Sequence, residues 1–137
     1  MKFLLLSLVL CALATASTAQ SSTMQMQMTI GKMLTLVRDL SVANIALAEN
    51  TEDQLALTSL YTTSEELYTL LQVFNSSNIA ALPLDSRTKL SNALTSFRNA
   101  LFAWESAMDQ RLPDEMTRTF KDVENAFLNF GGVVFSL

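Results

Sequence analysis

Three pairs of adjacent carboxylates are the residues whose types could perform acid or base chemistry in this 137-residue chain. The pairs are Glu52 with Asp53, Glu65 with Glu66, and Asp114 with Glu115. Two carboxylates can act as general acid and general base when both face one substrate. Neighbouring positions on a helix point about 100° apart, however, and each pair stands at a predicted helix start. We interpret the pairs as first-turn residues that interact favourably with the positive end of the helix dipole.

The residues that most often carry catalysis and metal binding are missing. The chain has no histidine, and its single cysteine is Cys11. This removes the usual imidazole base and, once Cys11 is cleaved off, the thiolate nucleophile. A copper(I) site at Met24, Met26 and Met28 is the alternative, but no histidine or cysteine accompanies these thioethers. We predict a protein that is not an enzyme, with no catalytic, cofactor-binding or metal-ligating residue.

Residues 1–19 have the layout of a signal peptide. Lys2 is followed by an apolar run over residues 3–14 and then by small residues, which favour cleavage after Ala19. Ala14 and Ala16 offer an earlier cleavage site, and a lipoprotein processed at Cys11 is an alternative that Leu10 disfavours. The run is shorter than the roughly 20 residues that a membrane-spanning helix needs. We predict a secreted protein, extracellular or associated with a cell wall, without a transmembrane segment after cleavage.

Cleavage would leave an acidic domain without cysteine. Removing 19 of 137 residues leaves 118, with eight basic and thirteen acidic side chains and a formal charge of −5. A chain of about 120 residues can bury enough surface to be stable without disulfides. The charge is unfavourable for binding to phosphate backbones, so we predict no nucleic-acid partner.

Residues 30–137 are predicted to form a single all-α domain, preceded by a flexible lead-in over residues 20–29. Apolar residues recur at spacings of three and four, which is typical of one helix face. The first helix is predicted over residues 30–48, with the inner positions Ile30, Met33, Val37, Leu40, Asn44 and Leu47. The second begins after Thr51 as its cap and carries Leu57, Leu60, Ser64, Leu67, Leu71 and Phe74. A second capping pattern at Thr63 leaves open a break near Thr62.

Two more helices follow. The third begins after Pro83, with Asp85 as its predicted cap, and carries Leu90, Leu94, Phe97, Leu101, Trp104 and Met108. The fourth opens at Pro113 and carries Met116, Phe120, Val123, Phe127, Phe130 and Val134, with Gly131 and Gly132 expected to stop or loosen it. Short connections place consecutive helices alongside each other, so the sequence predicts an antiparallel up-and-down four-helix bundle.

Two kinds of polar residue are singled out by their positions. Asn44 and Ser64 replace apolar residues in the inner stripes, and a buried asparagine more often fixes helix register than binds a ligand. Asn75, Ser76 and Ser77 form an N-glycosylation sequon, so Asn75 is a candidate glycosylation site in a eukaryotic host.

Large apolar residues exceed what four inner stripes need. They form either a wider core face or an apolar surface that binds a lipid, a surface or another protein. We select as candidate ligand or interface residues Phe102, Trp104, Val133, Phe135 and Leu137.

One family is similar in outline. The signal peptide, the cysteine-free helical domain, and the helix start Leu82-Pro83-Leu84-Asp85 with its stripe resemble fungal hydrophobic surface-binding and cell-wall mannoproteins, over roughly residues 30–134. The resemblance implies an extracellular helical domain that binds apolar surfaces or fatty-acid-like ligands, and it transfers no particular residue. We therefore expect a secreted, non-catalytic protein that binds an apolar ligand or surface. The alternative is a protein-interaction module or homo-oligomer without a small ligand.

Overall fold

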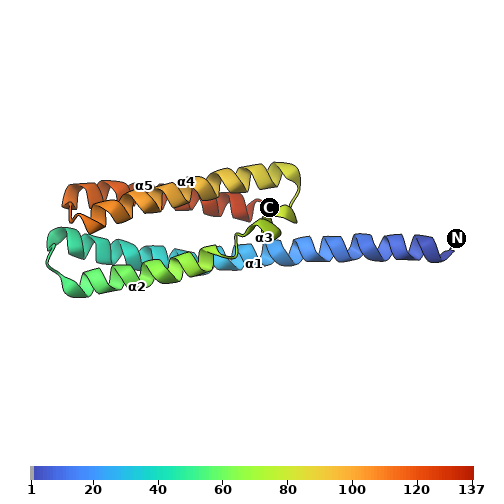
Figure 1. Ribbon diagram of the computed structural model, residues 1–137, viewed down its shortest axis with the longest axis horizontal. Coiled ribbons are helices and arrows are strands. Elements are labelled where there is room, and N and C mark those ends of the chain that lie inside the picture. Colours follow the sequence, from blue (N-terminus) through green and yellow to red (C-terminus); the bar gives the residue numbers. More distant parts are fainter. Residues whose placement is uncertain (1) are drawn as a thin grey trace.

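The computed structural model describes residues 2–137, with side chains from residue 22 onward. Its helices are α1 (Lys2–Glu49), α2 (Gln54–Leu71), the short α3 (Ser76–Ala80), α4 (Leu84–Asp109) and α5 (Pro113–Phe135), and the described residues contain no strand. The four long helices form the predicted antiparallel up-and-down bundle (Figure 1).

The bundle consists of two helical hairpins, α1 with α2 and α4 with α5. The hairpins are joined through α3, and their main helix-helix contact is between α1 and α5 (Figure 1). Side chains of α2 reach α4 on the opposite side, where the Tyr61 hydroxyl donates a hydrogen bond to Asp109 Oδ1 at 3.0 Å. Two surfaces therefore lie between the hairpins, one along α1 and α5 and one along α2 and α4.

The predicted inner stripes form the core. Every stripe residue of the first, third and fourth predicted helices is buried, and in the second stripe only Leu57 is half-buried. An aromatic cluster fills one end, where the Phe97 ring stacks on Phe130 with centroids 5.6 Å apart and Phe74 meets Phe130 edge-on at 4.8 Å. Helical periodicity alone identified this core correctly, because a side chain's direction on a helix depends only on its position in the repeat.

The expectation of a flexible lead-in over residues 20–29 is wrong. These residues continue α1 as helix, and Met26 and Ile30 are buried in the core. Met26 extends the stripe of Ile30 and Met33 by one helical turn, whereas Met24 and Met28 stay exposed. The alternation of methionine and glutamine concealed the helix, because its period of two is typical of extended chain.

Two helix starts also differ from the prediction. Asp53, not Thr51, caps α2, and its carboxylate accepts a hydrogen bond from the Ala56 amide at 3.0 Å. α4 begins one residue after Pro83, so Asp85 lies within its first turn instead of capping it. α2 runs without interruption through Thr62, since Leu60, Ser64 and Leu67 keep one continuous buried face.

The glycine pair does not end the fourth long helix. α5 continues through Gly131 and Gly132 to Phe135. A Cβ atom at Gly131 would lie 3.4 Å from Ile30 Cγ2, in van der Waals contact, so α5 packs directly against α1 at this position. Packing against α1 accounts for the helix continuing past two residues of low helix propensity.

The first part of α1 extends beyond the end of the bundle, past the other helices (Figure 1). Packing against other elements is described from Ser22, which is buried and whose hydroxyl lies 3.5 Å from Asn78 Oδ1. Within the part of the chain searched, no helix combines the length and apolar character needed to cross a membrane.

Candidate functional site

An apolar groove runs between α1 and α5 on the outside of the bundle. We call it the α1–α5 groove; its volume is about 500 Å³. Its floor consists of the buried side chains of Val37 and Phe127, and its apolar walls are Leu34, Val42 and Leu128. These three wall residues are 42%, 71% and 67% exposed, which is unusual for side chains of this size.

Three polar residues line the α1–α5 groove, Arg38 and Ser41 of α1 and Glu124 of α5. Ser41 of α1 donates a hydrogen bond to Glu124 Oε1 of α5 at 3.3 Å, which connects the two walls. Arg38, one turn away on α1, also lines the groove and forms no ion pair within residues 22–137. The groove therefore offers an apolar surface together with one exposed guanidinium group.

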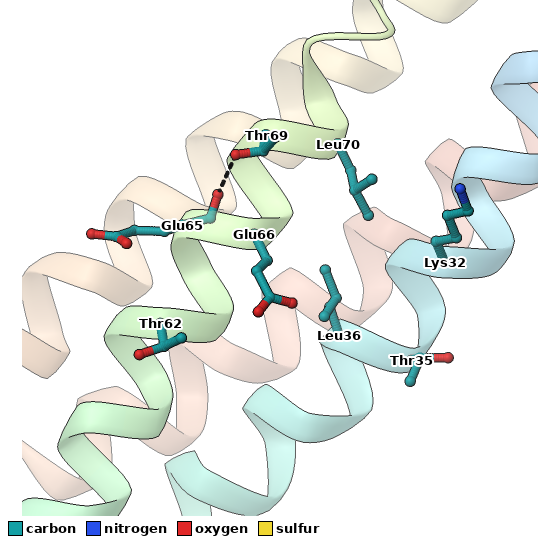
Figure 2. Close-up of a pocket in the computed structure, with 8 residues that line it drawn as sticks. All are labelled: Lys32, Thr35, Leu36, Thr62, Glu65, Glu66, Thr69 and Leu70. Atoms are coloured by element: carbon teal, nitrogen blue, oxygen red, sulfur yellow. Dashed lines mark hydrogen bonds between the residues drawn. The ribbon is translucent and has the colours of Figure 1, made fainter.

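A second groove lies between α1 and α2, and we call it the α1–α2 groove. Its volume is about 680 Å³, and Figure 2 shows Leu36 of α1 and Leu70 of α2 directed toward each other across it. Its other lining residues are polar, and include Lys32, Glu66 and threonines of both helices. Although this groove is larger, it offers an apolar ligand only two leucines.

Phe102 and Trp104 lie on opposite faces of α4. Trp104 is fully buried, its indole N–H donates to Asn44 Oδ1 at 2.8 Å, and its ring meets Phe120 edge-on. Phe102 lies on the outer face of α4, is 74% exposed, and lines neither groove. Trp104 thus serves the core, and Phe102 is an isolated surface residue.

The three candidate residues near the C-terminus differ in how deeply they are buried. Val133 and Leu137 are half-buried and pack against the core, while Phe135 is exposed. Leu137 lines a depression with Met24 and Leu82 at the end of the bundle. The structure therefore does not assemble the five candidate residues into one site.

The polar spot predicted at Asn44 and Ser64 separates into two environments. Asn44 is fully hydrogen-bonded to other helices, since it accepts from Trp104 of α4 and donates to the Met116 carbonyl of α5 at 3.3 Å. Ser64 is buried between α2 and α4, and its hydroxyl has no hydrogen-bond partner among residues 22–137. Asn44 thus joins α1 to α4 and α5 inside the bundle. The packing of the core does not account for the hydroxyl of Ser64.

Asn75 lies at the exposed start of α3. Its Oδ1 accepts from the Asn78 amide at 2.9 Å, and its Nδ2 donates to the Gln72 carbonyl at 3.0 Å. The sequon is thus on an accessible connection, and a glycosylated Asn75 Nδ2 would keep one N–H.

Two of the three acidic pairs lie at helix starts, but Glu65 and Glu66 do not: α2 runs unbroken from Gln54 to Leu71, so the prediction of a helix start there is wrong. Asp53 caps α2, and Glu115 in the first turn of α5 forms an ion pair with Arg118. Within the residues searched, no three acidic, histidine or cysteine side chains are grouped to hold a metal ion.

Comparison of the chain with protein-family models, with curated proteins and with solved structures found no match.

The α1–α5 groove was not predicted as a site from the sequence. Leu34, Val42 and Leu128 lie outside the predicted inner stripes, and their spacing does not reveal a groove, because their role depends on which face of α1 meets α5.

Proposed function

We propose that this protein is a secreted, non-catalytic binding protein for apolar ligands, with the α1–α5 groove as its binding surface. The observation that carries the proposal is the exposure of Leu34, Val42 and Leu128 together above an apolar floor. Apolar surface of this kind is stabilised when a ligand covers it, by roughly 25 cal/mol per Å². The groove volume of about 500 Å³ is in the range of small-molecule sites.

Arg38 favours a ligand with a single negative end, of fatty-acid type. The guanidinium group presents several donors in a plane that suits a carboxylate, and Arg38 forms no ion pair within the described side chains. Glu124 lies in the same groove but accepts from Ser41, so its charge is partly satisfied within the protein. An acyl chain along Leu34 and Leu128 with its carboxylate at Arg38 matches the composition of the groove.

Secretion is part of the proposal and has two supports. The first 19 residues have the charge, apolar run and small residues of a signal peptide. The first part of α1 also extends beyond the bundle, so cleavage there would leave the packed part of α1 in place (Figure 1). The resemblance to fungal surface-binding proteins agrees with this role and stays a prediction.

A displacement assay with the purified protein tests the proposal. An environment-sensitive fluorescent dye is bound first, and oleate is then titrated to displace it. Leu128→Gln should weaken oleate binding by about tenfold, since it removes roughly 1–2 kcal/mol of apolar contact. Arg38→Gln should weaken oleate more than the uncharged alcohol of the same chain length.

Phe102→Gln is the matched control for Leu128→Gln, because both residues are exposed apolar side chains but Phe102 lies away from the groove. It should leave oleate binding unchanged. The absence of saturable dye or oleate binding, or equal effects of the two variants, would contradict the proposal.

Self-association is the second candidate function, and the exposed apolar residues along α1 favour it. Val42, Ile45 and, at the start of α2, Leu55 are all exposed beyond what one small ligand would cover. A stable dimer buries about 1,200 Å² or more, which a helix face of this length can supply. Analytical ultracentrifugation distinguishes the two functions. A dimer that is disrupted by Val42→Glu or Phe135→Ser would support self-association. A protein that stays monomeric and binds oleate would support the binding of apolar ligands.

A further inference from the structure

A narrow cleft separates α2 from α4, on the side of the bundle away from the α1–α5 groove. We call it the α2–α4 cleft; its volume is about 190 Å³. α2 contributes Tyr61, Ser64, Glu65 and Tyr68, and α4 contributes Glu105, Met108 and Asp109. The α2 residues are spaced by three, one and three positions, so they share one face of the helix. Glu65 borders both this cleft and the α1–α2 groove, and in Figure 2 its carboxylate is directed away from that of Glu66.

Two tyrosines face acidic residues across this cleft. The Tyr61 hydroxyl donates to Asp109 Oδ1 at 3.0 Å, and Tyr68 lies close enough to Glu105 for the two side chains to shift each other's pKa values. Both tyrosines and both carboxylates line the same cleft.

Ser64 lies between the tyrosines and gives an independent indication of a ligand. Its hydroxyl is the one buried side-chain oxygen or nitrogen within residues 22–137 that has no hydrogen-bond partner. The residue is 7% exposed and lines the cleft. A buried hydroxyl without a partner costs about 1–3 kcal/mol, which a donor in the cleft would recover.

The charges of the lining are all negative. Glu65, Glu105 and Asp109 line the cleft, whereas no lysine or arginine does. Burial raises the pKa of Glu105, the hydrogen bond from Tyr68 lowers it, and the charge of Asp109 raises it further. Arg98 is near enough for its charge to lower the pKa of Tyr68, but it does not line the cleft. A cation bound here would relieve the repulsion between the carboxylates.

We propose that the α2–α4 cleft binds a small organic ammonium compound. The ammonium group would donate to Ser64 Oγ and to the carboxylates of Glu105 and Asp109, and its organic part would lie between the rings of Tyr61 and Tyr68. Tyrosine faces attract cations, and carboxylates and hydroxyls accept from the three N–H groups of a primary ammonium.

The size and composition of the cleft exclude the other ligand classes considered. Its volume corresponds to about six water molecules, which is too small for an acyl chain. Within the residues searched, the three carboxylates do not form a group that could hold a metal ion, and Asp109 already accepts from Tyr61. This leaves a small cation that brings its own donors and an apolar part.

Isothermal titration calorimetry with n-butylammonium chloride, which has five non-hydrogen atoms, tests the proposal on the purified protein. We expect saturable binding with one site per chain, and a loss of about tenfold in affinity for Glu105→Gln. Calcium chloride at the same ionic strength should not compete. The matched control is Glu66→Gln, which makes the same charge change on α2 but outside the cleft, and it should bind as the unmodified protein does.

Ser64→Ala separates binding from stability. Removing the unpartnered hydroxyl should raise the melting temperature of the free protein by roughly 2–6 °C and weaken ammonium binding at the same time. No saturable binding by the unmodified protein, equal losses for Glu105→Gln and Glu66→Gln, tighter binding of calcium, or unchanged affinity in Ser64→Ala would each overturn the proposal. Oleate displacement in the α1–α5 groove should be unaffected by these variants, so the two proposals fail independently.

Discussion

Asn44, Trp104 and the Met116 carbonyl form a hydrogen-bonded connection between α1, α4 and α5 inside an otherwise apolar core. The geometry satisfies both ends of the Asn44 amide and the Trp104 indole N–H. A one-turn shift of any of these helices would leave a buried polar group unpaired, so the connection fixes the register of the bundle.

Removing one member of this connection should be costly. We predict that Asn44→Ala and Trp104→Phe each lower the free energy of unfolding by about 2–4 kcal/mol, because each leaves a buried partner unsatisfied. Urea unfolding measures both, and a double-mutant cycle should give a coupling of about 1 kcal/mol or more. Asn129→Ala, at an exposed position of α5, is the control and should change stability by less than about 0.5 kcal/mol. A loss for Asn44→Ala as small as that of the control would contradict the register role.

Tyr68 should titrate at unusually high pH. Burial, the hydrogen bond with Glu105 and the negative charge of Glu105 raise the pKa of Tyr68 well above its ordinary value of 10.0, and Arg98 opposes them. Because the pKa is raised in the folded state, the stability that Tyr68 contributes is present below pH 10 and is lost as the pH rises above it. Ultraviolet titration of the protein minus that of Tyr68→Phe should show the phenolate only above pH 10. A difference spectrum with a midpoint at or below pH 10 would contradict the buried contact.

At the scale of helices, local capping and tertiary packing determine different boundaries. Asp53 caps α2 because its carboxylate reaches the Ala56 amide, and Pro113 begins α5, where an unpaired N–H is not needed. The C-terminal part of α5 is instead retained by contact with α1, across the glycine at position 131. Helix ends that rest on packing are the ones that local sequence signals miss.

The continuity of α5 can be tested at Gly132. No atom outside the helix lies within 4 Å of a Cβ placed there, and the residue is helical. Gly132→Ala should therefore stabilise the protein by about 0.5–1 kcal/mol through helix propensity alone. Thermal unfolding measures the change. If Gly132→Ala lowered the melting temperature, the helix would end at the glycines as the sequence pattern had indicated.

At the scale of the molecule, α1 is longer than the bundle that it helps to form. Its contacts with other elements are described from Ser22 onward, where the predicted signal peptide has already ended. Met26 is fully buried near that end of the bundle. The first 19 residues can therefore be removed without taking any of the described packing.

Two shortened chains test this division. A chain that begins at Gln20 should unfold in one cooperative transition and keep the groove-dependent dye binding. A chain that begins at Gln27 loses the buried Met26 and should be destabilised by about 2–5 kcal/mol, as for removal of a large core side chain. Differential scanning calorimetry measures the thermal unfolding of both chains. Equal stability of the two chains would show that the helix before Gln27 does not contribute to the bundle.

Helical periodicity correctly predicted the fold class and the inner face of each long helix over residues 30–137. Residues such as Leu40, Phe97 and Val123 were placed in the core correctly because the direction of a side chain follows from its position in the helical repeat, and that repeat is a local property. The start of α5 at Pro113 was predicted for the same reason, since the preference for proline in a first turn is also local.

Which helix faces contact each other could not be predicted from the spacing of residues along the chain. Leu34 and Leu128 line one groove because α1 packs against α5, and Tyr61 faces Asp109 because α2 lies beside α4. These contacts join residues far apart in the chain, and nothing in the spacing along one helix specifies its neighbour. Trp104 shows both cases. Its place on the inner stripe followed from the sequence, whereas its hydrogen bond to Asn44, 60 positions earlier in the chain, depends on how α1 and α4 are aligned.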